Sequence, residues 1–150
     1  MTERVIRVGT RAVIFNSDDE LLVVHNLLPD SNCYYLPGGG VWFHEKIDDC
    51  LVREVKEETG LEVKVNRLLW VRDFLEGFPD LHGIEMFFLA TITGGKYQPV
   101  HETERLESSF MNVEELKHIQ FYPISFVAKL MKLRDDRNWS EGNPYQRSAP

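Results

Sequence analysis

The chain has 150 residues and a formal net charge of −7, with 43% hydrophobic and 27% charged residues, which is the balance of one globular domain and excludes a disordered chain. So acidic a balance argues against a protein that holds nucleic acid by bulk attraction to phosphates, although a bound cation can supply positive charge locally. No apolar run approaches the roughly 20 residues that cross a bilayer, and the N-terminus lacks the build of a signal peptide, so a cytoplasmic protein without a membrane partner is expected.

Strands are predicted to open the chain. A first strand is expected over residues 5–15, and the polar turn 16–19 leads into a second strand over residues 21–25. These two strands are expected to form a hairpin. A polar loop then leads to the short apolar run 33–36.

One long helix is predicted in the first half of the chain. The breaker at residues 37–40, Pro-Gly-Gly-Gly, separates it from the strands, and a helical pattern then runs from about Lys46 to Thr59. Gly60 follows this pattern directly, at the place where glycine favours the left-handed backbone that ends helices.

The second half of the chain alternates strands and short helices. Two β-rich runs are followed by an exposed acidic loop, a helical turn and an amphipathic helix, over residues 61–74, 82–93, 96–108, 113–118 and 124–133. A brief strand is expected near Phe110. Residues 1–134 are expected to form one domain, and the polar tail 135–150 to be frayed. Because the alternation is irregular, the expected fold class is α/β (α+β), with a mixed β-sheet between helices.

Three glutamates gather near the end of the predicted helix. At about 100° per residue, Glu54 and Glu58 lie one turn apart on one face, with Glu57 beside them. Carboxylates this close repel one another unless a cation lies between them. Oxygen ligands of this charge suit a hard ion, so the group is a candidate site for Mg²⁺ or Mn²⁺.

The alternative is an acidic helix face that is simply solvated. The angles count against it, because Glu54 and Glu58 continue the apolar stripe of the helix, whereas other charges occupy the opposite side. The stripe contains Ile47, Cys50 and Leu51, and the opposite side contains Asp49, Arg53 and Lys56. Burial of two acids without a partner would cost several kcal/mol, which a metal site explains.

The same stretch carries a known signature. It reads Gly39, five residues, Glu45, seven residues, Arg53-Glu54-Val55, one residue, Glu57-Glu58, one residue, Gly60-Leu61. At every specified position it resembles the Nudix box, the 23-residue signature of the Nudix hydrolase family. The order of the flanking strands extends the likeness loosely over residues 5–133.

The resemblance implies an α/β/α sandwich in which the box forms a loop, a helix and a second loop. In the family, the acids at the positions of Glu54, Glu57 and Glu58 bind the divalent cations. The residues at the positions of Glu45 and Arg53 support the loop and the helix through ion pairing and hydrogen bonds.

The resemblance also bears on the loop residues of the box. Gly39 and Gly60 would serve tight backbone geometry, and Gly39 and Gly40 are candidate contacts to the bound cofactor. Many family members carry Glu at the position of Trp42 and Gly at the position of His44. Trp42 is expected to pack, with a substrate contact as the alternative, and His44 is expected to be an exposed loop residue.

The chemistry implied is attack by water on one phosphorus of a diphosphate bridge, with in-line displacement of the other phosphate and cations neutralising the charge. The general base is expected to be either Glu54 or an acid of the 96–108 loop, where Glu104 is the first choice. Arg11 and Arg72 lie in β-rich runs and are candidates to reach a substrate phosphate. The alternative for both arginines is a surface ion pair.

The expected substrate is a small nucleotide or nucleoside diphosphate derivative, whose identity the sequence leaves open. ADP-ribose enzymes of the family often carry an additional N-terminal portion, and only about ten residues come before the first strand is well under way here, which disfavours that group. No stable nucleic-acid partner is expected. A homodimer is compatible with the resemblance, because dimers are common in the family.

Two rival functions share the fold. A non-catalytic nucleotide-binding sensor is disfavoured, because the box is complete and no room remains for a DNA-binding domain. An isoprenoid diphosphate isomerase needs a reactive cysteine, whereas Cys50 is predicted mid-helix on the inward side. Cys33 and Cys50 also lack metal-ligand spacing, so both are expected to be ordinary reduced thiols.

Overall fold

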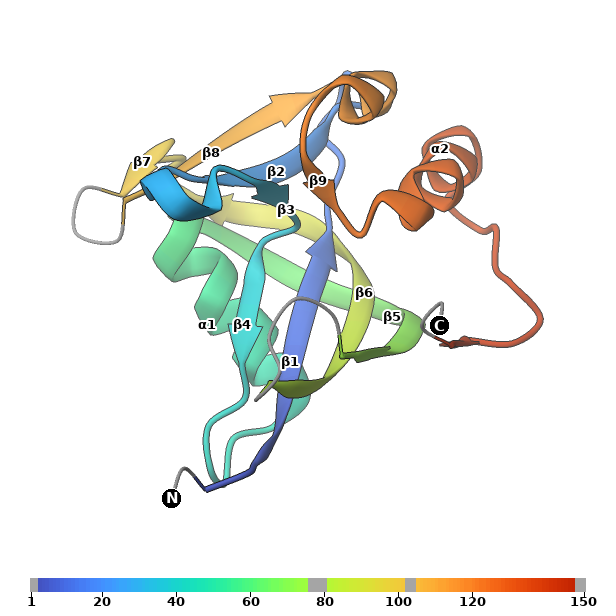
Figure 1. The fold of residues 1–150 in the computed structure, drawn as a ribbon. Helices are drawn as coiled ribbons and strands as arrows, with labels where there is room; N and C mark the ends of the chain where they lie inside the picture. The colour runs from blue at the N-terminus through green and yellow to red at the C-terminus, as the bar shows by residue number, and fades with distance from the viewer. Residues whose placement is uncertain (1–2, 76–80, 102–104, 148–150) are drawn as a thin grey trace.

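The computed structural model describes residues 3–75, 81–101 and 105–147, whose strands form two five-stranded sheets (Figure 1). The first sheet has the order β10-β5-β6-β1-β4, with the bounds Tyr145–Gln146, Leu61–Phe74, His82–Gly95, Ile6–Val13 and Gly38–Gly40. The second has the order β7-β8-β2-β3-β9, with the bounds Val100–His101, Leu106–Met111, Leu21–Asn26, Tyr34–Tyr35 and Phe121–Tyr122.

Both sheets are mixed, which confirms the predicted sheet type. In the first sheet, β5 and β6 form a long antiparallel pair, whereas β1 runs parallel to β6 and antiparallel to β4. In the second sheet, β3 runs parallel to β9, and the other pairs are antiparallel. The parallel pairs join segments that are far apart in the sequence.

The predicted hairpin between the first two strands is wrong in its extent. The chain does turn back after residue 15, since Phe15 bridges Leu21 and the N–H of Leu22 donates to the carbonyl of Ile14 at 2.9 Å. However, β1 belongs to the first sheet and β2 to the second. The reason is that β1 is already flanked by β4 and β6.

Helices cover both sides of the first sheet, as predicted. Helix α1 (Ile47–Thr59) packs against β1, β4 and β5, and it ends at Gly60, whose φ is 76°. On the other side lie two 3₁₀ helices and α2, with the bounds Val113–His118, Ile124–Phe126 and Val127–Asp135. Within the described ranges, no helix is both long enough and apolar enough to cross a membrane.

Two cores lie on the two sides of the first sheet. Ala12 and Ile14 pack with residues of α1, whereas Val13 packs with residues of α2. The alternation follows from the strand geometry, in which successive side chains point to opposite faces. The core on the side of α2 contains three aromatic rings whose centroids lie 4.9 to 6.0 Å apart, those of Trp70, Phe87 and Phe126.

The C-terminal tail, expected to fray, lies against the first sheet as far as it is described. Tyr145 and Gln146 form β10 beside β5. Arg67 of β5 donates to the carbonyls of Arg137 and Trp139 at 2.9 and 2.6 Å.

The predicted acidic loop 96–108 contains more regular structure than expected. Val100 and His101 form β7, which pairs with β8, and β8 begins at Leu106. Glu104, the first choice for a loop base, lies outside the described residues.

Candidate active site

Strand β4 brings the start of the box against β1 and α1. Gly38 has a φ of 149°, and a Cβ atom there would overlap the carbonyl of Thr10. A Cβ atom on Gly39 would lie 2.5 Å from Oε1 of Glu54 and 2.6 Å from Oε2. Glycine at these two positions therefore allows the close approach of the strand, its neighbour and the helix carboxylate.

Arg53 ties the loop of the box to the helix. Its side chain is 17% exposed, and Nε and Nη2 donate to the two carboxylate oxygens of Glu45 at 2.7 and 3.1 Å. Nη1 donates to Glu54 at 2.7 Å and to Glu57 at 3.3 Å, and Nη2 donates to the Gly40 carbonyl at 3.1 Å. A two-pronged ion pair of this kind fixes geometry as well as charge.

The helix angles predicted a solvent-facing Arg53, and the structure differs because the loop after β4 folds back over it. The Trp42 ring lies 3.5 Å from Cζ of Arg53, a cation–π contact, although Trp42 remains 60% exposed. Trp42 therefore packs, as expected, but on a charged group. His44 is exposed, also as expected, and its φ of 64° is a backbone that suits glycine.

The contacts of Arg53 shift the pKa values of both partners. The hydrogen bond from Arg53 is the main cause that lowers the pKa of Glu45 to about 2. Hydrogen bonds to Glu45 and then Glu54 raise the pKa of Arg53 above its ordinary value. The pair is therefore ionised throughout the neutral range.

The three acids of α1 differ in exposure. Glu58 is buried, at 6% exposed, and the side chains of Glu54 and Glu57 are 16% and 45% exposed. A solvated acidic face therefore describes Glu57 alone. Glu54 and Glu57 both accept from Nη1 of Arg53, so their carboxylates converge on one cationic atom.

These acids are the candidate cation ligands. In the arrangement seen here Arg53 holds two of them, and nowhere in the described ranges do three His, Cys, Asp or Glu side chains gather closely enough for a metal site. The donor chemistry nevertheless fits a hard ion, because all three groups are carboxylates and two of them are mostly buried. The backbone of Gly39 packs closely against the Glu54 carboxylate, because glycine has no side chain that would displace it.

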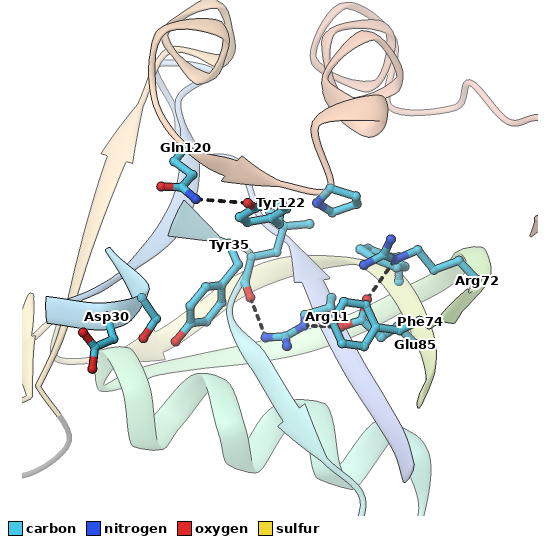
Figure 2. A pocket seen from close by; sticks show the side chains of 12 residues that line it. Arg11, Asp30, Tyr35, Arg72, Phe74, Glu85, Gln120 and Tyr122 are labelled. Atoms are coloured by element: carbon cyan, nitrogen blue, oxygen red, sulfur yellow. Dashed lines mark hydrogen bonds and ion pairs between the residues drawn. The ribbon is translucent and has the colours of Figure 1, made fainter. Parts of the chain in front are cut away.

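A cavity of about 370 Å³ opens beside β1, a volume within the usual range for small-molecule sites (Figure 2). In Figure 2, Arg11, Glu85 and Arg72 lie together on one side, with Tyr122 and Gln120 above them and Asp30 across the cavity. Its walls include four aromatic rings, those of Tyr35, Phe74, Phe87 and Tyr122.

Arg11 and Arg72 both line this cavity, so their ion pairs lie in its wall. Arg72 is 7% exposed and donates from Nε to Oε2 of Glu85 at 2.9 Å. Arg11 donates from Nε to Oε1 of the same carboxylate and from Nη1 to the carbonyl of Leu36, both at 3.1 Å. The surface-pair alternative is therefore wrong for Arg72, which is buried. For Arg11, which is partly exposed, the ion pair exists, but it lies in the wall of the cavity.

Glu85 was missed by the sequence reasoning. The signal that could have found it is an acid inside the apolar run 84–90, because a carboxylate in such a strand needs a partner. The identity of the partners could not be read, since it depends on how β1, β5 and β6 align.

Arg11 couples the cavity to the box. Burial opposes its charge, yet Glu85 and then Glu58 of α1 raise the pKa of the Arg11 guanidinium above its ordinary value. Arg11 also lies 5.1 Å from the ring centroid of Tyr35. Arg11 therefore interacts electrostatically with Glu58 of the box and also lines the cavity.

Cys50 has a structural environment. Its Sγ lies 3.4 Å from the carbonyl oxygen of Gly40 and 3.5 Å from Oγ1 of Thr10, and burial raises the pKa of the thiol. A buried thiol with a raised pKa is a poor nucleophile, which argues against the isomerase alternative. Cys33 and Cys50 are both free.

Comparisons with known proteins agree with this geometry. The family model described as NUDIX domain matches residues 5–130. The ADP-ribose pyrophosphatase of Methanocaldococcus jannaschii is 32% identical over 128 residues, which cover 85% of this chain and 75% of that protein. An 8-oxo-dGDP phosphatase of Danio rerio is 35% identical over 96 residues, which cover 62% of this chain and 27% of that protein.

A solved structure also matches this chain over most of its length. The crystal structure of an ADP-ribose pyrophosphatase from Streptococcus suis is 29% identical, with a TM-score of 0.67, and the match covers 95% of this chain and 98% of that one. The complete box, the mixed sheets between helices and these matches agree with one another. The chain therefore belongs to the Nudix family and is one of its pyrophosphohydrolases.

Proposed function

We propose that this hydrolase cleaves the diphosphate bond of a nucleoside diphosphate sugar such as ADP-ribose. The observation that carries the proposal is the position of Arg11, which lines a cavity of about 370 Å³ and whose charged form Glu58 of the box stabilises. Two relatives named ADP-ribose pyrophosphatase match most of this chain and most of their own length. Their similarity outweighs the sequence argument against ADP-ribose.

The acids of α1 are proposed to hold the divalent cation, Mg²⁺ or Mn²⁺. When bound, that cation neutralises charge on the phosphates and makes water easier to deprotonate. The ligands are Glu54, Glu57 and Glu58. Arg53 contacts Glu54 and Glu57 directly, and Glu45 acts on them through Arg53, whose hydrogen bonds fix the loop against the helix.

Glu54 is proposed as the general base, with Glu104 as the alternative. The Oε1 atom of Glu54 accepts from Arg53, and the backbone of Gly39 packs against the same carboxylate. A carboxylate with one oxygen held is oriented while the other remains able to accept a proton from water. Loss of activity in Glu54→Gln that greatly exceeds the loss in Glu104→Gln supports this assignment, and the reverse order removes it.

The experiment is a turnover panel. Hydrolysis of ADP-ribose consumes one water and gives AMP and ribose 5-phosphate, so both products are measured with Mg²⁺, with Mn²⁺ and with EDTA. NADH, UDP-glucose and 8-oxo-dGDP are the competing substrates. Metal-dependent cleavage of ADP-ribose well above the others is expected. A clear preference for another compound, or equal rates with EDTA, contradicts the proposal.

Variants of α1 complete the test. Glu58→Gln is expected to lower kcat by orders of magnitude at limiting Mg²⁺ with the fold retained, because a buried metal ligand is lost. Asp49→Asn is the matched control, since Asp49 is an exposed acid of the same helix. A non-catalytic sensor would bind nucleotides without turnover, and the complete box favours the enzyme.

The setting of the enzyme is also proposed. The free thiols of Cys33 and Cys50 support a reducing compartment such as the cytoplasm. A homodimer is proposed on the resemblance to the family alone, and light scattering at several protein concentrations tests it.

A further inference from the structure

The alignment of three strands creates an unusual cluster in the cavity wall. Glu85 of β6 lies directly opposite Arg72 of β5 on one side and opposite Gly9 of β1 on the other. Gly9 has no side chain, and Arg11 lies two residues further along β1, on the same face of the strand. Glu85 therefore meets Arg72 across one pair of strands and Arg11 diagonally across the next.

The hydrogen bonds divide the donors of the two arginines into two sets. Both Nε atoms donate to the carboxylate of Glu85, and Nη1 of Arg11 donates to the carbonyl of Leu36. Among the described residues, the remaining donors, Nη2 of Arg11 and both Nη groups of Arg72, have no hydrogen-bond acceptor. The two side chains line the cavity, so these donors are available to a ligand there.

The charges of the cluster are unequal. Two guanidinium groups share one carboxylate, so the group carries an excess positive charge in a wall that also contains Phe74 and Phe87. Among the described residues, the other acids near the cavity are Asp30 across it and Glu58, whose charge favours the charged form of Arg11. Arg72 is the more deeply buried cation, and a buried charge without full compensation attracts an anion.

We infer that Glu85 is a positioning residue, which aligns Arg11 and Arg72 into a receptor for a phosphate group of the substrate. This inference rests on the proposed function and deepens it, because it assigns the anionic part of the nucleotide to the two arginines. Each carboxylate oxygen of Glu85 accepts from the Nε atom of one arginine, which holds the two guanidinium groups side by side. The aromatic rings of Tyr35 and Tyr122 then offer flat surfaces for the base.

A binding experiment without turnover tests the inference. ADP and adenosine, which share a base and differ in phosphates, are titrated into the protein in EDTA by calorimetry. The wild type is expected to bind ADP at least about tenfold more tightly than adenosine, since charge-assisted hydrogen bonds are the strong ones. Arg72→Met is expected to remove most of that difference and to leave adenosine binding unchanged.

The sign of the effect in Glu85→Gln separates two roles. If Glu85 acted only through its charge, its removal would leave the cavity more positive and ADP would bind more tightly. A positioning role predicts that ADP binds more weakly, with partial rescue in Glu85→Asp, which keeps the charge on a shorter side chain. Tighter ADP binding in Glu85→Gln overturns the inference.

Controls keep the outcome interpretable. Glu62→Gln is matched, because Glu62 is an exposed glutamate of β5 that pairs with Lys56 away from the cavity, and unchanged ADP binding is expected. Thermal melts confirm that each variant folds. If neither Glu85 variant folds, the ADP affinity of Arg72→Met becomes the test of the phosphate receptor. Equal affinities of the wild type and Arg72→Met for ADP overturn the receptor.

The two hypotheses can fail separately. Hydrolysis of ADP-ribose together with equal binding of ADP and adenosine retains the proposed function and removes the receptor. ADP binding that depends on Arg72, in a protein that cleaves nothing in the panel, retains the receptor and removes the proposed function. Where turnover occurs, Glu85→Gln is expected to raise KM more than it lowers kcat.

Discussion

Gly39 of β4 lies directly against the carboxylate of Glu54 in α1, so that a Cβ atom on Gly39 would be only 2.5 Å from Oε1. Real side chains do not approach this closely, and an added methyl group would therefore displace the carboxylate. The glycine that begins the box thus determines where a proposed catalytic acid can lie.

Gly39→Ala is expected to lower kcat/KM by at least about tenfold, because a small displacement of a catalytic group has large effects on rate. Gly40→Ala is the matched control, since a Cβ atom there would have nothing within 4 Å. Steady-state kinetics of the two variants, with thermal melts, provide the measurement. Equal kinetics in both variants would show that the close contact between Gly39 and Glu54 does not affect catalysis.

Glu45→Gln is expected to flatten the acid branch of the stability profile. The pKa of Glu45 is about 2 in the folded protein against an ordinary 4.5, so its ionised form stabilises the fold. That contribution is fully present above pH 4.5 and is lost as the pH falls towards 2. Urea midpoints of wild type and variant are measured across this window. The gap between them should narrow on acidification, and a constant gap contradicts the assignment.

Arg53→Lys is expected to destabilise the protein by about 1–3 kcal/mol, because a lysine cannot reproduce the hydrogen bonds to Glu45 and Glu54 together. Urea denaturation gives the difference in free energy of unfolding. Arg7→Lys is the control, because Arg7 is an exposed residue of β1, and a change within about 0.5 kcal/mol is expected there. A similar loss in both variants would refute a special role for Arg53.

Trp42→Leu is expected to cost about 0.5–1 kcal/mol of stability, the usual size of a cation–π contact at an exposed site. A double-mutant cycle isolates the contact, since the Trp42 ring lies 3.5 Å from Cζ of Arg53. In the Arg53→Met background the same substitution should have little effect. An undiminished loss there would mean that Trp42 packs on something other than the guanidinium.

The local features of the box were predictable from the sequence. Helix α1 ends at Thr59, as the helical period and Gly60 indicate, and the burial of Glu58 follows from its position on the apolar stripe. These features depend on neighbouring residues only. The helix angle alone puts Arg53 on the solvent side, because it contains no information about a loop that folds back over the helix.

The features that depend on distant pairing were not predictable. Nothing near Glu85 in the sequence shows that it faces Gly9 and Arg72, because this register joins three strands from separate parts of the chain. For the same reason β1 and β2 looked like a hairpin, although each belongs to a different sheet. Arg11 and Arg72 could be named as candidates, but their common partner could not.

The position of β10 has a consequence for solubility. Its residues Tyr145 and Gln146 pair with Val71 and Arg72 of β5, at the border of the first sheet. An uncovered border strand offers unpaired N–H and C=O groups to another copy and so becomes a template for aggregation. Loss of β10 would therefore leave the edge of β5 beside Val71 and Arg72 unpaired, and another copy of the chain could add a strand there.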